Sequence, residues 1–265
     1  MAFPLSSAEP VVVAVLGLGE AGSRIAAGLS AAGAVVRGFD PKVAAGPGIT
    51  ECASDEEASR GADAVLALTS AHEAKETLTL ALPGVGRDTI YADLNTASAG
   101  LKADLAELAA SAGIAFADVA LMSPVPGNGL RTPMLVSGPA ADTYARAIGG
   151  LGATVEVLPG PAGAASARKL VRSVFYKGLA AAVTEALRAA RAAGCEDWIR
   201  DNISAELDSF SAATLDRLEH GSIQHARRRA EEMAASADLL RELGVPPRIA
   251  SASEQWLVQL RDEHD

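Results

Sequence analysis

The feature that most constrains this chain lies near its beginning, where an apolar run, VVVAVLG (11–17), leads into a glycine-rich turn. A short, β-branched run of this kind predicts a buried strand, and the alanine-rich residues after it predict a helix. In between, Gly17, Gly19 and Gly22 have the spacing GxGxxG. This spacing permits a tight turn, a close approach of backbone to a ligand, and close packing of helix on strand. The segment therefore predicts a strand-turn-helix unit whose helix N-terminus binds the phosphates of a dinucleotide.

The same alternation of strand and helix continues to about residue 157. The runs that predict strands are 11–17, 34–40, 64–68, 89–94, 114–121, 134–138 and 153–157. After residue 160 only helices are predicted, separated at Gly194, around Gly221 and at 244–247. We therefore expect an α/β Rossmann domain with a doubly wound, mostly parallel sheet at 1–160, joined by a long helix to an all-helical domain at 161–265.

The second predicted strand ends at Asp40, where an acidic residue can accept hydrogen bonds from ribose hydroxyls. Such a residue would repel a 2′-phosphate, so Asp40 favours NAD over NADP, although Lys42 could pair with that phosphate. FAD is less favoured, because the remainder of the chain is small for a flavin-dependent substrate domain. The candidate cofactor-binding residues from this region are Gly17, Leu18, Gly19, Glu20, Ala21, Gly22, Asp40 and Lys42, together with Thr69 after the third run.

Composition excludes several other classes of protein. The formal net charge is −10 and the pI is near 4.9, which argues against a nucleic-acid or anionic membrane surface outside the short arginine run 227–229. The two cysteines, Cys52 and Cys195, form no CxxC pair and stand in no histidine cluster, so no metal is expected. No stretch is long and apolar enough to span a membrane and no targeting segment is recognised, so we expect a cytoplasmic protein.

A second notable stretch, GAASARKLVRS (163–173), contains one of only five lysines in the chain. On a helix over 166–192, Lys169, Arg172, Ser173 and Tyr176 share one face. The rest of that helix is mostly apolar, which predicts burial on nearly all sides.

Lysine in water has a pKa of about 10.4 and is mostly charged at neutral pH. Burial beside Arg168 and Arg172 would lower the pKa of Lys169, because desolvation and like charges disfavour the ammonium form. The neutral amine could then act as a general base, with Ser173 orienting it or binding substrate and Tyr176 relaying a proton. The plainer alternatives are a lysine whose stem covers apolar surface and a packed tyrosine.

The order of these features resembles the β-hydroxyacid dehydrogenase superfamily, which includes 3-hydroxyisobutyrate dehydrogenase and 6-phosphogluconate dehydrogenase. Its members carry a GxGxxxKxxxN motif at the start of the long helix, and the resemblance places Lys169 at the catalytic lysine. Ala165 stands in place of the second glycine, and Ser173 in place of an asparagine that helps to hold substrate. The resemblance covers nearly the whole chain and implies a divergent member with an atypical C-terminal helical domain.

Two other segments resemble landmarks of this superfamily. Residues 93–96 (DLNT) are similar to the DxST loop near the nicotinamide, which makes Thr96 a further candidate cofactor contact. Residues 118–124 (DVALMSP) occupy the place of the DAPVSGG segment, with Ser123 as a candidate substrate contact. Because Met122, Ser123 and Pro124 replace Ser-Gly-Gly, the acid that is bound here can differ from those of better-known members.

The resemblance implies an NAD(P)-dependent dehydrogenase that acts on the CH–OH group of a small β-hydroxy acid, with Lys169 as general acid/base. Arg172, His225 and Arg228 are candidate ligands for a substrate carboxylate, although an arginine run is more often a solvated helix face. Two alternatives remain open: reduction of a C=N bond, as in imine reductases, and a non-catalytic dinucleotide-binding protein. The apolar long helix predicts a homodimer through the helical domain.

Overall fold

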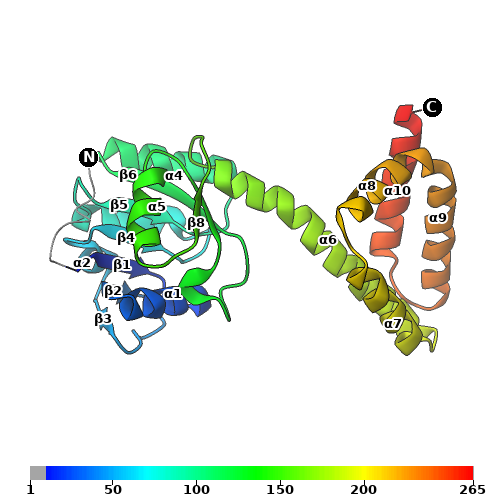
Figure 1. The fold of residues 1–265 in the computed structure, drawn as a ribbon, viewed down its shortest axis with the longest axis horizontal. Coiled ribbons are helices and arrows are strands. Elements are labelled where there is room, and N and C mark those ends of the chain that lie inside the picture. The colour runs from blue at the N-terminus through cyan, green and yellow to red at the C-terminus, as the bar shows by residue number, and fades with distance from the viewer. Residues whose placement is uncertain (1–9, 265) are drawn as a thin grey trace. The chain divides into compact units, whose positions relative to one another are not determined.

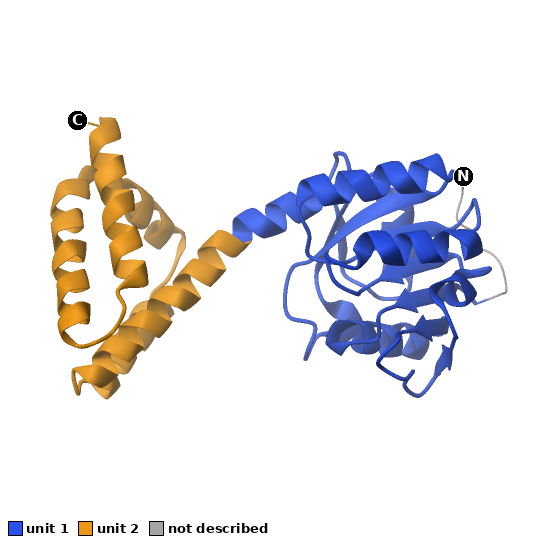
Figure 2. Cartoon of the chain, turned by 180° about the vertical axis from the view of Figure 1, so that it is seen from behind, with its two compact units in different colours: residues 1–172 blue, residues 173–265 orange. Residues whose placement is uncertain are grey.

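The computed structural model describes residues 10–264, which form two compact units divided between Arg172 and Ser173 (Figure 2). The division falls inside the long helix α6 (Ala164–Ala192), which begins shortly after residue 160, where the predicted first domain ends. The helix was predicted over 166–192, and the structure adds two residues at its beginning.

The first unit is built on one eight-stranded sheet with the order β3-β2-β1-β4-β5-β6-β7-β8 (Figure 1). Its strands are β1 (Val12–Leu16), β2 (Val35–Phe39), β3 (Ile49–Glu51), β4 (Ala64–Ala67), β5 (Ile90–Asp93), β6 (Ala115–Leu121), β7 (Met134–Ser137) and β8 (Val155–Val157). All neighbouring strands are parallel except β6 and β7. The predicted doubly wound, mostly parallel sheet is therefore confirmed. Strand β3 was missed, because three residues with two exposed side chains carry too short a pattern.

Helices cover both faces of this sheet. They are α1 (Glu20–Ala31), α2 (Asp55–Ser59), α3 (Ala74–Ala81), α4 (Ala99–Ser111) and α5 (Ala141–Gly150), with short 3₁₀ turns η1 (Leu82–Gly84) and η2 (Gly129–Arg131). One hydrophobic core contains Ile25 of α1 and Tyr144 of α5, and a second contains Leu78 of α3 and Leu105 of α4. Because the sheet is buried on both faces, the sequences of its strands are continuous apolar runs and do not alternate between apolar and polar residues.

The second unit continues α6 and adds α7 (Glu196–Asp208), α8 (Ala212–Gln224), α9 (Ala226–Glu242) and α10 (Arg248–His264). The Glu185 carboxylate of α6 accepts hydrogen bonds from the backbone N–H groups of Ile249 and Ala250, at 2.8 Å each, and so caps α10. The predicted breaks at Gly194 and 244–247 are confirmed. The break predicted around Gly221 lies at His225, because Gly221 itself is inside α8.

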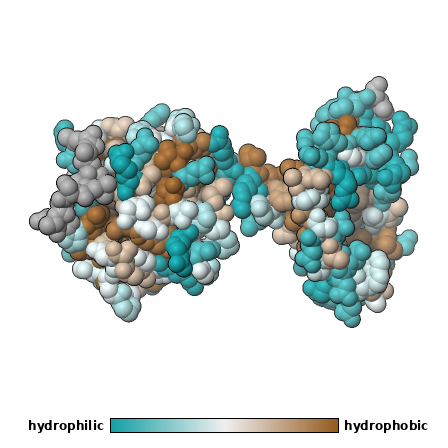
Figure 3. All heavy atoms as spheres, viewed as in Figure 1, coloured by the Kyte–Doolittle hydropathy of each residue, from teal (hydrophilic) through white to brown (hydrophobic). Residues whose placement is uncertain are grey.

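The predicted burial of α6 on nearly all sides is not observed in the single chain. Val171 and Val174 are 73% and 75% exposed, and Phe175 and Tyr176 are about half exposed. Hydrophobic side chains are visible on the surface along this helix in Figure 3. Within residues 10–264, none of the helices combines the length and the apolar character that a membrane span requires.

Candidate functional site

The turn after β1 leaves no room for side chains at two of its glycines. Gly17 has φ +92°, and a Cβ there would lie 2.5 Å from the carbonyl oxygen of Leu68. A Cβ on Gly22 would lie 1.9 Å from the carbonyl oxygen of Gly17. The first glycine therefore allows the turn, and the second lets α1 pack against it, as the sequence predicted.

Gly19 has the opposite surroundings, because nothing lies within 4 Å of the position of a Cβ. It is the N-cap of α1 and supplies no side-chain cap, and the first N–H groups of a helix have no acceptor within the helix. A pocket of about 450 Å³ opens here and is lined by Gly17, Gly19, Asp40, Lys42 and Thr69, among others. A bare helix N-terminus beside such a space fits the pyrophosphate of NAD(P), and the backbone of 17–22 would hold it.

Asp40 fastens the glycine-rich turn to the end of β2. Its Oδ2 accepts a hydrogen bond from the backbone N–H of Leu18 at 2.8 Å. Its Oδ1 accepts from the N–H groups of Lys42, at 2.8 Å, and Val43, at 3.0 Å. The carboxylate therefore orders two loops at the edge of the pocket, in addition to the ribose contact that the sequence predicted for it.

The pocket is acidic on its lining. Four acidic residues, Asp40, Asp55, Glu73 and Glu76, line it, together with one basic residue, Lys42. Burial raises the pKa of the Asp55 carboxyl, and the negative charges of Glu76 and Asp40 act in the same direction. An additional phosphate would meet this negative field at short range.

Thr69 connects the pocket with the next loop. Its hydroxyl lies 3.4 Å from the Thr77 hydroxyl and accepts a hydrogen bond, also at 3.4 Å, from the side-chain amide of Asn95. Among the other predicted contacts, Leu18 is buried and its side chain packs over Gly38, while Glu20 points outward beside Arg24. Ala21 is partly buried and packs against the core.

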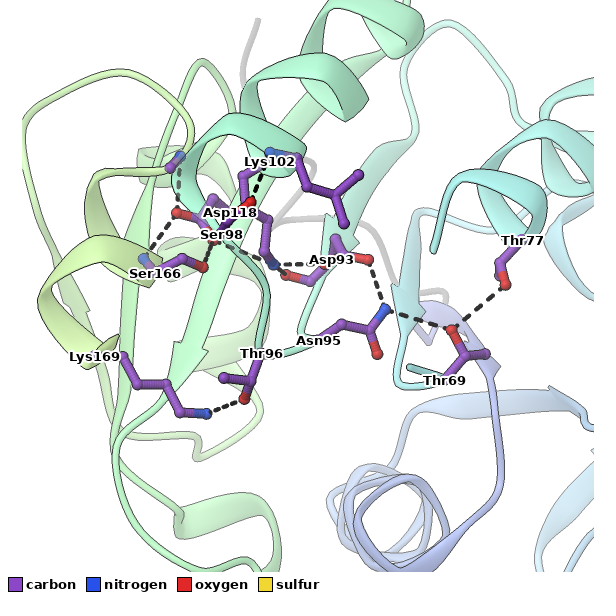
Figure 4. Close-up of polar contacts among 12 residues, drawn as sticks. Thr69, Thr77, Asp93, Asn95, Thr96, Ser98, Lys102, Asp118, Ser166 and Lys169 are labelled. Carbon is purple, nitrogen blue, oxygen red and sulfur yellow. Dashed lines mark hydrogen bonds and ion pairs between the residues drawn. The ribbon is translucent and has the colours of Figure 1, made fainter. Parts of the chain in front are cut away.

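Lys169 lies within the first turns of α6 and donates a hydrogen bond from its Nζ to the hydroxyl of Thr96 at 2.7 Å (Figure 4). Thr96 is in the loop between β5 and α4, so two residues far apart in the sequence meet here. Lys169 itself is partly buried, whereas Arg168 and Arg172 are exposed. The burial predicted for Lys169 beside Arg168 and Arg172 is therefore only partial, and both arginines face solvent.

The small residues before Lys169 allow the beginning of α6 to pack closely against α4 and the sheet. Gly163 has φ +99°, and a Cβ there would lie 2.7 Å from the carbonyl oxygen of Ala99, the first residue of α4. Ala165 is completely buried, and its N–H donates to the Ser137 hydroxyl at 3.0 Å. The alanine that replaces the second motif glycine thus fits the close contact between α6 and the sheet.

The remaining predicted residues lie in several places. The Ser123 hydroxyl oxygen is buried after β6 and makes no hydrogen bond within residues 10–264. Arg172 and Arg168 line a separate cavity of about 510 Å³ beside the beginnings of β7 and β8. Ser173, Tyr176, His225 and Arg228 belong to the second unit, where Arg228 pairs with Glu232 one turn further along α9.

Sequence reasoning missed the charged cluster of Lys102, Asp93 and Asp118, all completely buried. Asp93 and Asp118 were noted only as parts of family landmarks, and Lys102 was not noted. One signal was available: Lys102 shares the buried face of α4 with Leu105 and Ala109, at positions i, i+3 and i+7.

Comparison with known proteins agrees with this geometry. Residues 12–146 match the NAD binding domain of 6-phosphogluconate dehydrogenase, and residues 190–260 match a domain of unknown function, DUF1932. The chain therefore belongs to the family of that NAD-binding domain, as a divergent β-hydroxyacid dehydrogenase-like member. This membership supports an NAD(P)-dependent oxidoreductase. No curated protein matches the sequence.

Solved structures give the same fold over nearly the whole chain. A conserved hypothetical protein from Sinorhizobium meliloti 1021 is 26% identical, with a TM-score of 0.62 over 95% of this chain and 88% of that one. The conserved protein MTH1747, described as structurally similar to 3-hydroxyacid dehydrogenases, is 28% identical, with a TM-score of 0.58 over 95% and 97%. An imine reductase from Myxococcus stipitatus in complex with NADP⁺ has a TM-score of 0.80 over 96% and 95%, at 18% identity.

Substitution of the crowded Gly22 and of the open Gly19 should affect different properties, namely stability and cofactor binding. We expect Gly22→Ala to lower the free energy of unfolding by about 2 kcal/mol, because helix and turn must separate. Gly19→Ala, with open space around it, should change this free energy by less than about 0.5 kcal/mol and weaken NADH binding at least about tenfold by filling the phosphate space. Chemical denaturation and NADH fluorescence titration measure the two effects. Equal effects of the two variants on stability would contradict this assignment.

Proposed function

We propose that the protein is an NAD-dependent dehydrogenase that transfers hydride between the nicotinamide and the carbinol carbon of a small β-hydroxy acid. The observation that carries the proposal is the hydrogen bond between Lys169 and Thr96. The loop that holds Thr96 also holds Asn95, which contacts Thr69 on the lining of the pocket. An amine is thus held beside the loops that would receive the nicotinamide.

The residues of the chain supply the proton chemistry. Bound NAD would supply hydride acceptance or, when reduced, hydride donation. In the oxidative direction, neutral Lys169 removes the proton of the substrate hydroxyl, and in the reductive direction its ammonium returns this proton to the carbonyl oxygen. Thr96 orients the amine, because its hydroxyl oxygen accepts a hydrogen bond from the Lys169 Nζ. Loss of CO₂ after oxidation would require a substrate that bears a carboxylate β to the new carbonyl.

Reduction of a C=N bond is the competing function, because imine reductases share this fold. Lysine at position 169 supports the alcohol chemistry, because imine reductases of this architecture usually carry aspartate or tyrosine there. A non-catalytic dinucleotide-binding protein would require no ordered amine at this position. The Lys169–Thr96 contact therefore supports an enzyme over a passive binding protein.

Replacing Lys169 tests the proposed role directly. We expect Lys169→Met to lower turnover of 3-hydroxy acids by at least about 100-fold, because general acid/base catalysis typically contributes that much. Binding of NADH should be unchanged. Lys177→Met is the matched control, since Lys177 is exposed on the same helix.

Steady-state assays with a panel of 3-hydroxy acids and cyclic imines, together with NADH titration, measure these effects. Full turnover by Lys169→Met would refute the role of the amine. Activity toward imines alone would refute the alcohol chemistry.

The proposed preference for NAD over NADP rests on the acidic lining of the pocket. Four acidic residues and one basic residue, Lys42, line the pocket. The 2′-phosphate of NADP would add negative charge to this set, whereas the ribose hydroxyl of NAD would not.

We expect NADH to bind at least about tenfold more tightly than NADPH, and Glu76→Gln to narrow this difference by removing one negative charge. Glu107→Gln, at an exposed position on α4, serves as the control.

The affinities for NADH and for NADPH should both increase as the pH falls through the raised pKa of Asp55, because protonation of this carboxylate removes a charge that repels the phosphates. Fluorescence titrations at several pH values measure this, and tighter binding of NADPH would overturn the proposal.

A homodimer through the helical unit is the proposed assembly. Val174 and Phe175, at the beginning of this unit, are exposed apolar side chains on α6 that a second copy of the chain would remove from water, as is Val171 at the end of the first unit.

Sedimentation velocity at micromolar concentration should therefore show a dimer. Val174→Asp should shift it to a monomer, because a charge in a buried apolar interface is unfavourable. Val43→Asp, an equivalent change of an exposed valine in the first unit, should leave the dimer intact. A monomeric wild-type protein would contradict the proposed assembly.

A further inference from the structure

Lys102, Asp93 and Asp118 form a buried ionic cluster near the Lys169–Thr96 contact. The ammonium of Lys102 donates to the backbone carbonyl of Asp93 at 2.8 Å, pairs with the Asp93 carboxylate, and lies 3.2 Å from Oδ1 of Asp118. All three side chains are completely buried. Figure 4 shows the cluster between the loop that carries Thr96 and the beginning of α6.

On one side, the cluster closes the loop between β5 and α4. Asp93 is the last residue of β5, and Lys102 lies in the first turns of α4, so their contact joins the two ends of the segment 94–98. The other carboxylate oxygen of Asp93 accepts a hydrogen bond from the Asn95 amide at 2.8 Å. The loop that presents Thr96 is therefore held at both ends and from within.

On the other side, the cluster holds the beginning of α6. Oδ2 of Asp118 accepts hydrogen bonds from the N–H groups of Gly163, at 2.9 Å, and Ser166, at 3.1 Å. Its Oδ1 accepts from the Ser166 hydroxyl at 2.6 Å. Lys169 lies three residues beyond Ser166 on the same helix, so Asp118 fixes the turn from which Lys169 extends.

Stability alone is a poor explanation for this arrangement. Buried ion pairs lose much of their attraction to desolvation, and well-packed apolar side chains are often as stabilising. What the arrangement does supply is a fixed geometry, because one ammonium contacts the carboxylates that organise both partners of the Lys169–Thr96 hydrogen bond.

We propose that Lys102 is a positioning residue, which through Asp93 and Asp118 sets the place of the Lys169 amine relative to Thr96. The catalytic consequence rests on the proposed function of Lys169, whereas the geometric consequence does not. Lys102 is completely enclosed, so it would act on the reaction only through the residues that it positions.

The test uses the full-length protein with Lys102→Met and with the double variant Asp93→Asn/Lys102→Met. The double variant leaves no unpaired charge on Asp93, and Asp118 retains its donors from α6 and Ser137. Lys75→Met, at an exposed position on α3, is the control. Circular dichroism establishes that each variant is folded.

The first measurement is the rate of acetylation of Lys169 by acetic anhydride as a function of pH, with Lys177 as the internal reference in peptide mass spectrometry. We expect the variants at position 102 to raise the relative rate at Lys169 about fivefold, as the hydrogen bond to Thr96 loosens. The second measurement is turnover with the best 3-hydroxy acid. We expect kcat to fall by about 10- to 100-fold, because small displacements of a catalytic group have effects of this size, with little change in the Kd of NADH.

A folded double variant with wild-type acetylation and kcat would overturn the proposal. So would failure of both variants to fold, which would assign the cluster a purely structural role. Failure of the proposed function has a different signature: Lys169→Met would retain turnover, while the variants at position 102 would still change the acetylation of Lys169.

Discussion

The carboxylate of Asp118 is the group on which the arrangement of this site depends. A helix begins with N–H groups that have no acceptor in the helix, and at the beginning of α6 two of these groups and one hydroxyl donate to Asp118. A buried carboxylate is itself unfavourable without compensation, which the helix N-terminus and the Lys102 ammonium provide. The long helix is thereby attached to β6 at a defined position, and Lys169 with it.

The parts of the fold that could be predicted are those in which neighbouring residues determine the outcome. The glycine-rich turn is such a case, because Gly17 and Gly22 are required by contacts with Leu68 and with each other. The alternating apolar runs likewise predicted seven of the eight strands, and the position of Lys169 followed from a local motif. Each of these signals lies within a few residues of the structure that it specifies.

The parts that could not be predicted depend on partners far apart in the sequence. Lys102 finds its counterions on two different strands, and a single lysine among alanines and leucines gives no indication of both. The helix break expected around Gly221 has a different, local explanation. An isolated glycine is tolerated inside a helix, so α8 continues through Gly221 and the break lies at His225. Burial along α6 was also overestimated. An apolar sequence indicates that a helix face is buried, but it does not indicate whether the same chain or a second copy buries it.

The hydrogen bonds of Asp40 have a consequence for protein engineering. Exchanging the acidic residue after the second strand is the obvious way to change the cofactor preference of such a domain. In this chain the same carboxylate also anchors Leu18 in the glycine-rich turn and orders the loop at Lys42. A redesign at this position would alter the phosphate-binding backbone along with the ribose contact. The more separable positions are Glu73 and Glu76, which bring charge to the pocket from helix α3 and its N-cap without holding that turn.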